Sequence, residues 1–211
     1  LADEGITVEF FSADTETDEG VDALALQALA GGTIDILVNN VGGASNPEGA
    51  GRGFSATPSG DWANTYYKCV VGAVRLINHL VPAMREQGWG RIINISATAG
   101  LEPPDDTPAE YAAAKAGTNT MTMSLSRHLS QTGVTVNAVT PGPILTEGLQ
   151  AWMEGMAAAR GWGDDPKVQE QMFLKEVLPL TVKRLGQPND IAAMVAFIAS
   201  TQADFITGSN I

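Results

Sequence analysis

The chain is poor in basic residues, histidine and cysteine, and each shortage argues against a class of protein. The chain has 12 Lys and Arg but 24 Asp and Glu, which gives a formal net charge of -12. This negative charge disfavours nucleic acid and anionic membranes as partners. The single cysteine, Cys69, excludes an internal disulfide framework and suits a reducing cytosol. No His/Cys/Asp cluster has metal-ligand spacing, so we expect no metal site. Because no apolar run is long enough to span a bilayer, we expect a cytoplasmic protein.

The apolar residues that are present suffice for one core. The chain has 211 residues, 44% of them hydrophobic, which predicts a single domain over residues 1–211. Three continuous apolar runs bounded by Gly or Pro predict strands buried on both faces: Ile34–Val38, Arg91–Ser96 and Val134–Val139. Long helical patterns lie at about residues 61–87, 108–131 and 188–200. Alternating strands and helices predict an α/β fold with a doubly wound parallel sheet, whose ligands bind at the carboxyl ends of the strands.

One helical segment carries candidate chemistry. Tyr111 and Lys115 are four residues apart and therefore share a helix face. An ammonium about 4 Å from a phenolate is worth roughly 4 kcal/mol at an effective dielectric near 20. This interaction would lower the phenol pKa towards neutrality and let Tyr111 exchange a proton with a substrate. A surface lysine lying over a ring is the alternative for this pair.

Further motifs extend the pattern along the whole chain. They are Asn39-Asn40-Val41-Gly42, Tyr111-Ala112-Ala113-Ala114-Lys115, Pro141-Gly142-Pro143-Ile144-Leu145-Thr146, Arg184-Leu185-Gly186-Gln187-Pro188-Asn189-Asp190-Ile191-Ala192 and Phe205-Ile206-Thr207-Gly208-Ser209-Asn210. In this order and spacing the chain resembles the short-chain dehydrogenase/reductase family, in its single-domain, 3-oxoacyl-reductase-like branch. The resemblance implies a Rossmann-like fold with three layers, αβα, and NAD or NADP as the cofactor.

Against that family, segments are missing at both ends. Ile6–Phe11 resembles the family's third strand, and residues 205–210 lead into its last strand. The first βαβ unit, with the Gly-rich phosphate turn, is absent, and no G-x-G-x-x-G motif occurs. We therefore expect the native polypeptide to be longer.

The resemblance assigns roles to particular positions. Tyr111 is the proton donor or acceptor, and Lys115 binds the nicotinamide ribose and lowers the pKa of Tyr111. Asp14 and Thr15 approach the adenine. The remaining positions implied to bind cofactor are Asn40, Val41 and Gly42, on the ribose and nicotinamide side, and Pro141, Gly142, Ile144 and Thr146, at the carboxamide. Without the resemblance, Asn40 would be a cap and Pro141-Gly142 a plain turn.

The sequence departs from the family at two positions. The family's substrate-binding serine aligns with Ala97, and either Ser96 or Thr98 is the replacement; we favour Ser96. Neighbouring strand side chains face opposite ways, so either hydroxyl requires a local twist. The family's helical Asn, which holds a water beside the Lys, aligns with Cys69, and a thiol is a weak hydrogen-bonding substitute.

The family's substrate lid corresponds to about residues 147–183. Its apolar side chains either line a substrate pocket or pack the lid: Trp152, Met153, Met156 and Met172. Few positive charges lie there, which disfavours a strongly anionic substrate. By resemblance the long helices pair across subunits, in a homotetramer or dimer.

Two functions fit these observations. The first is an NAD(P)-dependent oxidoreductase that interconverts a small-molecule carbonyl and a secondary alcohol, with Tyr111 moving the proton. The second is a catalytically weak or silent relative that serves in binding or assembly. Ala97 and Cys69 favour the second function, whereas Tyr111 and Lys115 favour the first.

Overall fold

The computed structural model describes residues 5–44, 54–104 and 107–211. The chain divides into two compact units. Leu1–Thr140 and Ile198–Ile211 form the main unit, and Pro141–Phe197 form the second unit. A single catalytic domain over residues 1–211 stays a prediction.

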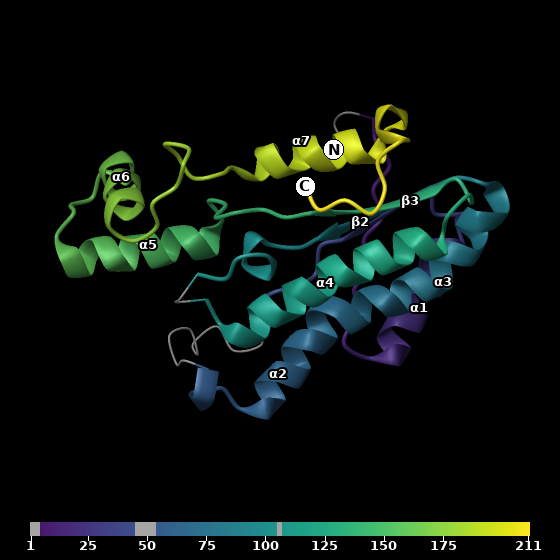
Figure 1. The fold of residues 1–211 in the computed structure, drawn as a ribbon, viewed down its shortest axis with the longest axis horizontal. Coiled ribbons are helices and arrows are strands. Elements are labelled where there is room, and N and C mark those ends of the chain that lie inside the picture. Colours follow the sequence, from purple (N-terminus) through teal and green to yellow (C-terminus); the bar gives the residue numbers. More distant parts are fainter. Residues whose placement is uncertain (1–4, 45–53, 105–106) are drawn as a thin grey trace. The chain divides into compact units, whose positions relative to one another are not determined.

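The main unit is built on a parallel sheet in the order β1-β2-β3 (Figure 1). Its strands are β1 (Ile36–Asn39), β2 (Gly90–Ile95) and β3 (Val134–Val139). Each strand lies within two residues of its predicted bounds. Asn39 pairs with Asn94, and Ile95 pairs with Val139, so the strands end at one edge of the sheet. That edge is where a doubly wound sheet binds ligands.

Helices α1, α3 and α4 lie together on one face of this sheet (Figure 1). The α-helices of the main unit are α1 (Asp18–Leu29), α2 (Ser59–Tyr66), α3 (Gly72–Gln87) and α4 (Ala109–His128). Tyr67–Val71, between α2 and α3, is a π-helix, so the helical stretch predicted over 61–87 is present and contains one π segment. The helix predicted to reach 131 ends at His128, because the chain turns back at Gln131 with a φ of 63°.

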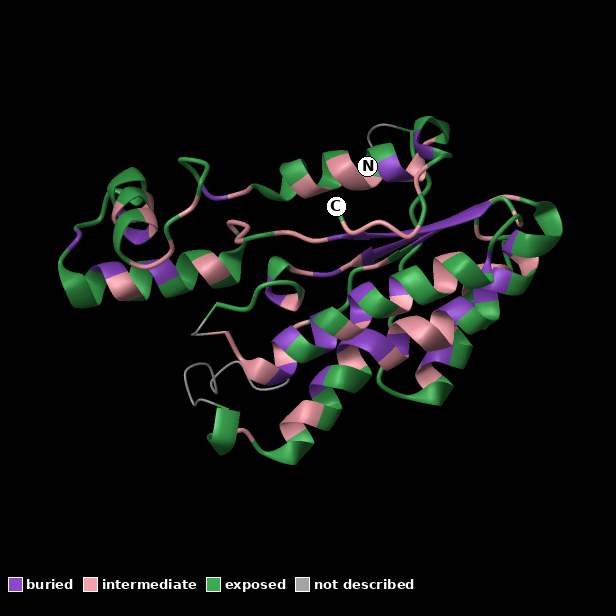
Figure 2. Ribbon diagram, in the orientation of Figure 1, coloured by how far each residue is buried: buried purple, intermediate pink, exposed green. Residues whose placement is uncertain are grey.

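The core of the main unit lies between these helices and the sheet. Figure 2 shows burial concentrated in β2 and β3 and along parts of α3 and α4. The buried apolar cluster consists of Leu37, Ile77, Leu80, Val81, Met84, Ile92, Leu129, Val134 and Val136. β3 is buried at every position. This explains why its apolar run predicted both its bounds and its burial on two faces.

The two segments that resemble further strands of the family have different outcomes in the structure. No strand forms at Ile6–Phe11, where Phe10 is 90% exposed. A strand requires a hydrogen-bonded neighbour, and no described segment pairs with this one, so the prediction was wrong here. The tail does follow β3: the Gly208 N–H donates to the Val136 carbonyl at 2.7 Å, and the Ile211 N–H donates to the Ala138 carbonyl at 3.0 Å.

The second unit contains α5 (Glu147–Arg160), α6 (Pro166–Glu176) and most of α7 (Pro188–Ala199). Its buried cluster is Met153, Ala157, Trp162, Phe173 and Leu185, with Met156 and Met172 packed against it. The methionines of the predicted lid therefore contribute to packing. Trp152 remains 46% exposed, with its ring edge-to-face against Phe173 at 5.1 Å.

An ion pair organises the start of α7. The Arg184 guanidinium donates to both carboxylate oxygens of Asp190, at 2.6 and 3.0 Å, and the Gln187 N–H donates to the same carboxylate at 2.7 Å. These hydrogen bonds, Arg184 first, lower the pKa of Asp190 to about 2. They hold the first part of the run Arg184–Ala192 in a fixed turn ahead of α7.

Candidate active site

Tyr111 and Lys115 lie one turn apart near the start of α4, which begins after Pro108. Lys115 is only 4% exposed, and its Nζ donates to the Ile95 carbonyl at 2.7 Å. The same Nζ lies 5.7 Å from the centroid of the Tyr111 ring, within the range of a cation–π contact. The expected meeting of the two side chains is therefore present, at the carboxyl end of β2.

The expected lowering of the Tyr111 pKa is wrong. Burial raises the pKa of Tyr111 above its ordinary value, and the electrostatic influence of the nearby Cys69 acts in the same direction. Burial also lowers the pKa of Lys115. Removal of both groups from water penalises their charged forms, and here desolvation outweighs the attraction that we expected. At neutral pH the phenol is protonated, which is the form that donates a proton.

A titration tests this direction. Because the Tyr111 pKa is raised from 10.0, the phenol of the unliganded protein should not ionise until the pH exceeds 10. The measurement is the near-ultraviolet absorbance of phenolate in wild type minus Tyr111→Phe as the pH is raised. A difference signal centred near neutrality would contradict the expectation.

The hydroxyls beside Ala97 differ in what they contact. The Ser96 side chain is 4% exposed and its Oγ donates to the Lys115 backbone carbonyl at 3.1 Å. It therefore ties the end of β2 to α4. Thr98 is exposed, at the first position of a 3-10 helix, Thr98–Gly100. The role of Ser96 towards substrate stays a prediction, and the geometry favours Thr98 as the hydroxyl open to a ligand.

Gly100 is a site residue that the sequence analysis missed. A β-carbon on Gly100 would lie 2.6 Å from the backbone carbon of Lys115 and 2.7 Å from the backbone nitrogen of Ala116. The Asn119 amide also donates to the Gly100 carbonyl, at 3.4 Å. The turn after β2 therefore lies directly against the backbone of α4 at the catalytic candidate Lys115. Its signal in the sequence was a glycine just beyond a strand.

Cys69 lies inside the π-helix and faces the same cluster. Its Sγ donates to the Gly43 carbonyl at 3.7 Å. A β-carbon on Gly42 would lie 2.9 Å from the Lys115 Nζ and 3.6 Å from the Cys69 Sγ. The thiol, the amine and the bare backbone of Gly42 thus meet at one point. Single-turn π-helices are frequent at functional sites. Here the π-helix contains Cys69, the residue that aligns with the family's Asn.

A buried amide network joins the strand ends behind this point, and the sequence analysis missed it too. The Asn39 amide donates to the Asn94 side-chain oxygen at 2.8 Å, and the Asn94 amide donates to the Thr122 hydroxyl at 2.9 Å. Asn94 and Thr122 are fully buried. Buried polar groups that are satisfied in this way fix one arrangement of their elements. The signal was an asparagine directly after the first apolar run, Asn39, and another inside the second, Asn94.

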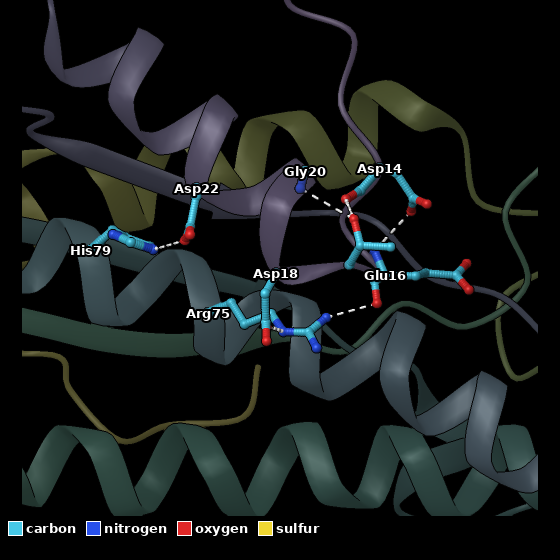
Figure 3. Close-up of polar contacts among 8 residues, drawn as sticks. Asp14, Glu16, Asp18, Gly20, Asp22, Arg75 and His79 are labelled. Carbon is cyan, nitrogen blue, oxygen red and sulfur yellow. Dashed lines mark hydrogen bonds and ion pairs between the residues drawn. The ribbon is translucent and has the colours of Figure 1, made fainter.

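The predicted adenine side lies at the turn before α1 (Figure 3). The Asp14 carboxylate accepts from the Glu16 N–H at 2.9 Å. Thr15 lines a cavity of about 300 Å³ together with Asn40, Val41 and Gly72, at the lower end of the usual range for ligand pockets. The structure therefore brings Thr15 together with two of the three predicted residues that follow β1. Asp18, at the start of α1 beside this turn, pairs with Arg75 of α3.

The remaining predicted cofactor residues belong to the second unit. Ile144 forms a bridge with Gly186, and the Leu145 N–H donates to the Gly186 carbonyl at 2.8 Å. The Thr146 hydroxyl caps α5 by accepting from the Leu149 N–H at 3.4 Å. Pro141 and Gly142 precede this pairing. Within the second unit these four residues belong to the segment that leads into α5, which is held by the pairing with Gly186.

The main-unit residues fit a dinucleotide. The bare backbone of Gly42 lies directly against the buried Lys115 amine, and a β-carbon there would lie only 2.9 Å from the Lys115 Nζ. The cavity at Thr15, Asn40 and Val41 has mostly apolar walls, as adenosine-type ligands require. In the described part of the chain no group of three or more His, Cys, Asp or Glu side chains is arranged to hold a metal ion. Nor does that part include a helix with the length and apolar character needed to cross a membrane.

Known proteins match this chain over most of its length. The family model described as enoyl-(acyl carrier protein) reductase matches residues 1–211. An acetoacetyl-CoA reductase of Rhizobium meliloti is 33% identical over 192 residues, which are 90% of this chain and 70% of that protein. L-Sorbose reductase from Gluconobacter frateurii, solved with NADPH and L-sorbose, is 29% identical with a TM-score of 0.88, covering 99% of this chain and 76% of its own. NAD⁺-bound xylitol dehydrogenase is 26% identical with a TM-score of 0.80, covering 99% and 79%.

These matches confirm the predicted Rossmann-like αβα class. They also favour the enzyme over the silent binding or assembly protein, because the relatives are named reductases and dehydrogenases. Their structures hold NADPH or NAD⁺, which agrees with the predicted cofactor, NAD or NADP. The chain therefore belongs to the short-chain dehydrogenase/reductase family, in its 3-oxoacyl-reductase-like branch, as an NAD(P)-dependent oxidoreductase of carbonyl and secondary-alcohol groups.

Proposed function

We propose that Tyr111 donates its proton to the substrate carbonyl oxygen during reduction and takes it back during oxidation. The observation that carries this proposal is the pair on α4: Lys115 Nζ lies 5.7 Å from the Tyr111 ring and is fixed by the Ile95 carbonyl. A bound NAD(P)H supplies the hydride. Lys115 holds the nicotinamide ribose and brings positive charge to Tyr111, which offsets the desolvation of the phenolate when oxidation requires it.

The other cofactor roles that the family resemblance implies are proposed for residues within each unit. Asp14 and Thr15 bind the adenine end, and Asn40, Val41 and Gly42 offer backbone to the ribose beside Lys115. The second-unit residues proposed for the nicotinamide carboxamide are Pro141, Gly142, Ile144 and Thr146. Support comes from the cavity that joins Thr15 to Asn40 and Val41. Residues 147–183 serve as the substrate lid, with Trp152 as its exposed aromatic contact.

We also propose a cytoplasmic homo-oligomer, a tetramer or dimer, that acts on an uncharged or weakly charged small molecule. An apolar groove of about 550 Å³ runs beside α4 and supports helix pairing between subunits. Its lining includes Phe54 and Trp62, whose rings meet edge-to-face at 5.3 Å, and the exposed Ala113 and Ala116. Light scattering in solution measures the oligomeric state.

A spectrophotometric assay of the full-length protein tests the activity. NADH or NADPH should be oxidised in the presence of a carbonyl compound, and the names of the relatives supply the first panel. L-Sorbose represents an uncharged substrate, and acetoacetyl-CoA represents a strongly anionic one that we expect to be turned over more slowly. Xylitol with NAD⁺ tests the reverse direction. Turnover of any one of these, or of another ketone, with either dinucleotide supports the proposal. A folded protein that binds neither dinucleotide would contradict it.

The same assay distinguishes the two hydroxyls. Thr98→Ala should lower kcat about 10²-fold, the typical loss of one hydrogen-bond donor to a developing oxyanion. Ser96→Ala removes the hydrogen bond to the Lys115 carbonyl, so we expect a loss of stability of about 1 kcal/mol and a smaller loss of rate. If Ser96→Ala is the slower enzyme at equal stability, the assignment of Thr98 is wrong.

A further inference from the structure

Arg75 of α3 reaches the turn that precedes α1 (Figure 3). Its Nη1 donates to the Glu16 carbonyl at 2.8 Å, and its Nε pairs with the Asp18 carboxylate. The guanidinium also lies 5.8 Å from the centroid of the Tyr67 ring, at the start of the π-helix. The Arg75 side chain is 20% exposed, whereas that of Asp18 is 74% exposed. Because exposed ion pairs contribute little, the bond to the Glu16 carbonyl is the more consequential contact.

Two glycines let the same turn approach its neighbours closely. A β-carbon on Gly72 would lie 2.7 Å from the Thr15 carbonyl oxygen, and one on Gly20 would overlap the Asp14 carbonyl. Both contacts are with backbone atoms, which cannot rotate away as a flexible side chain can. The Thr17 hydroxyl closes the turn by donating to the Asp14 carbonyl at 3.3 Å and accepting from the Gly20 N–H at 3.1 Å. The backbone of Asp14 and Thr15 is therefore held between α1 and α3.

The turn held in this way borders the proposed adenosine site. Thr15 and Gly72 both line the cavity of about 300 Å³ that also includes Asn40 and Val41. Arg75 does not line that cavity and acts on it only through the turn. On α3, Gly72 and Arg75 are three residues apart and share a face, so one helix face supplies both the space for the Thr15 carbonyl and the tie at Glu16.

We propose that Arg75 is a positioning residue for the dinucleotide. By binding the Glu16 carbonyl and Asp18, it keeps Asp14 and Thr15 at the border of the cavity in one arrangement before the adenosine half arrives. Preorganisation of this kind raises affinity because binding no longer has to order the loop. The inference rests on the proposed function, and it concerns cofactor affinity and not the chemical step.

His79 provides a matched control on the same helix. It lies four residues after Arg75, and its Nε2 contacts the Asp22 carboxylate of α1 at 2.8 Å (Figure 3). This contact also joins α3 to α1 and is exposed on both sides, at 40% and 59%. It differs in one respect: it holds the body of α1 and does not contact the turn. Substitution of either residue therefore weakens the packing of α1 on α3, whereas only substitution of Arg75 removes the contact with the turn.

The experiment compares Arg75→Leu with His79→Leu in the full-length protein. NADH and NADPH are titrated by fluorescence, kcat is measured at saturating cofactor, and thermal unfolding is recorded for each variant. Arg75→Leu should raise the dinucleotide Kd and KM about tenfold, the loss expected for one charge-assisted hydrogen bond. Its kcat should stay within about twofold, since the chemistry is untouched. His79→Leu should leave Kd within about twofold, as exposed pairs contribute little.

Other outcomes overturn the inference. Equal affinities for the two variants, or a kcat at saturation that falls as steeply as the affinity, assign Arg75 a purely structural role. If Arg75→Leu does not fold, Arg75→Lys decides: it keeps the charge and loses the planar fork, and an unchanged Kd rejects the proposal. Wild-type protein that binds neither dinucleotide defeats the proposed function itself, which is a distinguishable result.

Discussion

Tyr111→Phe is expected to lower kcat about 10²–10⁴-fold, the usual contribution of a positioned general acid or base. The substitution removes one oxygen and leaves the aromatic ring, so the contact with the Lys115 Nζ at 5.7 Å is preserved. Tyr111 is only partly buried and its hydroxyl takes part in no described hydrogen bond. Dinucleotide affinity should therefore remain within about twofold, because a group that acts in the transition state changes kcat more than binding.

Tyr67→Phe is the matched control for this prediction. Tyr67 is 47% exposed, begins the π-helix next to Cys69 and carries the same phenol. Its loss should leave kcat within about twofold, as is usual for surface changes away from the chemistry. Steady-state turnover and cofactor titration of both variants give the comparison. If Tyr111→Phe retains activity within a few-fold of wild type, Tyr111 does not carry the proton, even though the family assignment stands.

The fold was predictable where a strand is buried on both faces, because such a strand appears in the sequence as a continuous apolar run. β3 matches its predicted bounds because every residue from Val134 to Val139 is buried, and the glycines and prolines beyond the strands mark their ends. The outer segments were less predictable, because strand formation at Ile6–Phe11 depends on a neighbour and not on its own apolar pattern. Hydrophobic periodicity predicted the helical stretch over 61–87 but gave no signal of the π-helix at Tyr67–Val71 within it.

The candidate site was predictable as a set of positions more than as a set of interactions. The spacing of Tyr111 and Lys115 was enough to place both on one face of α4. It did not predict the direction of the Tyr111 pKa, because desolvation depends on tertiary burial, which the sequence does not state. Nor did it predict that Ser96 bonds to the Lys115 carbonyl, because side-chain direction at a strand end depends on the local twist.

Gly100 shows that part of the site depends on close backbone packing, which no functional side chain marks in the sequence. It has no functional group, yet its missing side chain lets the turn after β2 lie against the α4 backbone at Lys115 and Ala116. Three links converge there: the Ser96 hydroxyl on the Lys115 carbonyl, the Lys115 Nζ on the Ile95 carbonyl, and the Asn119 amide on the Gly100 carbonyl. Together they set the distance between strand end and helix, and hence the location of Lys115.

Gly100→Ala is accordingly expected to impair both stability and turnover. The added carbon would lie 2.6–2.9 Å from Lys115 C, Ala116 N and Lys115 Cβ, and two of these are backbone atoms that cannot rotate away. Overpacking of this kind costs about 1–3 kcal/mol of unfolding free energy. Relief by a shift of the turn or of α4 moves Lys115 relative to Ile95, and a misplacement of about 1 Å costs on the order of 10² in rate.

Gly60→Ala is the matched control, because no atom lies within 4 Å of the β-carbon that it would add near the start of α2. It should leave turnover unchanged and raise stability by up to about 1 kcal/mol, as alanine does in helices. Urea unfolding and kcat at saturating cofactor are the measurements for both variants. Wild-type turnover in Gly100→Ala would mean that α4 tolerates the displacement. The strand-to-helix contact would then not be what fixes Lys115, and its bond to the Ile95 carbonyl would have to do so alone.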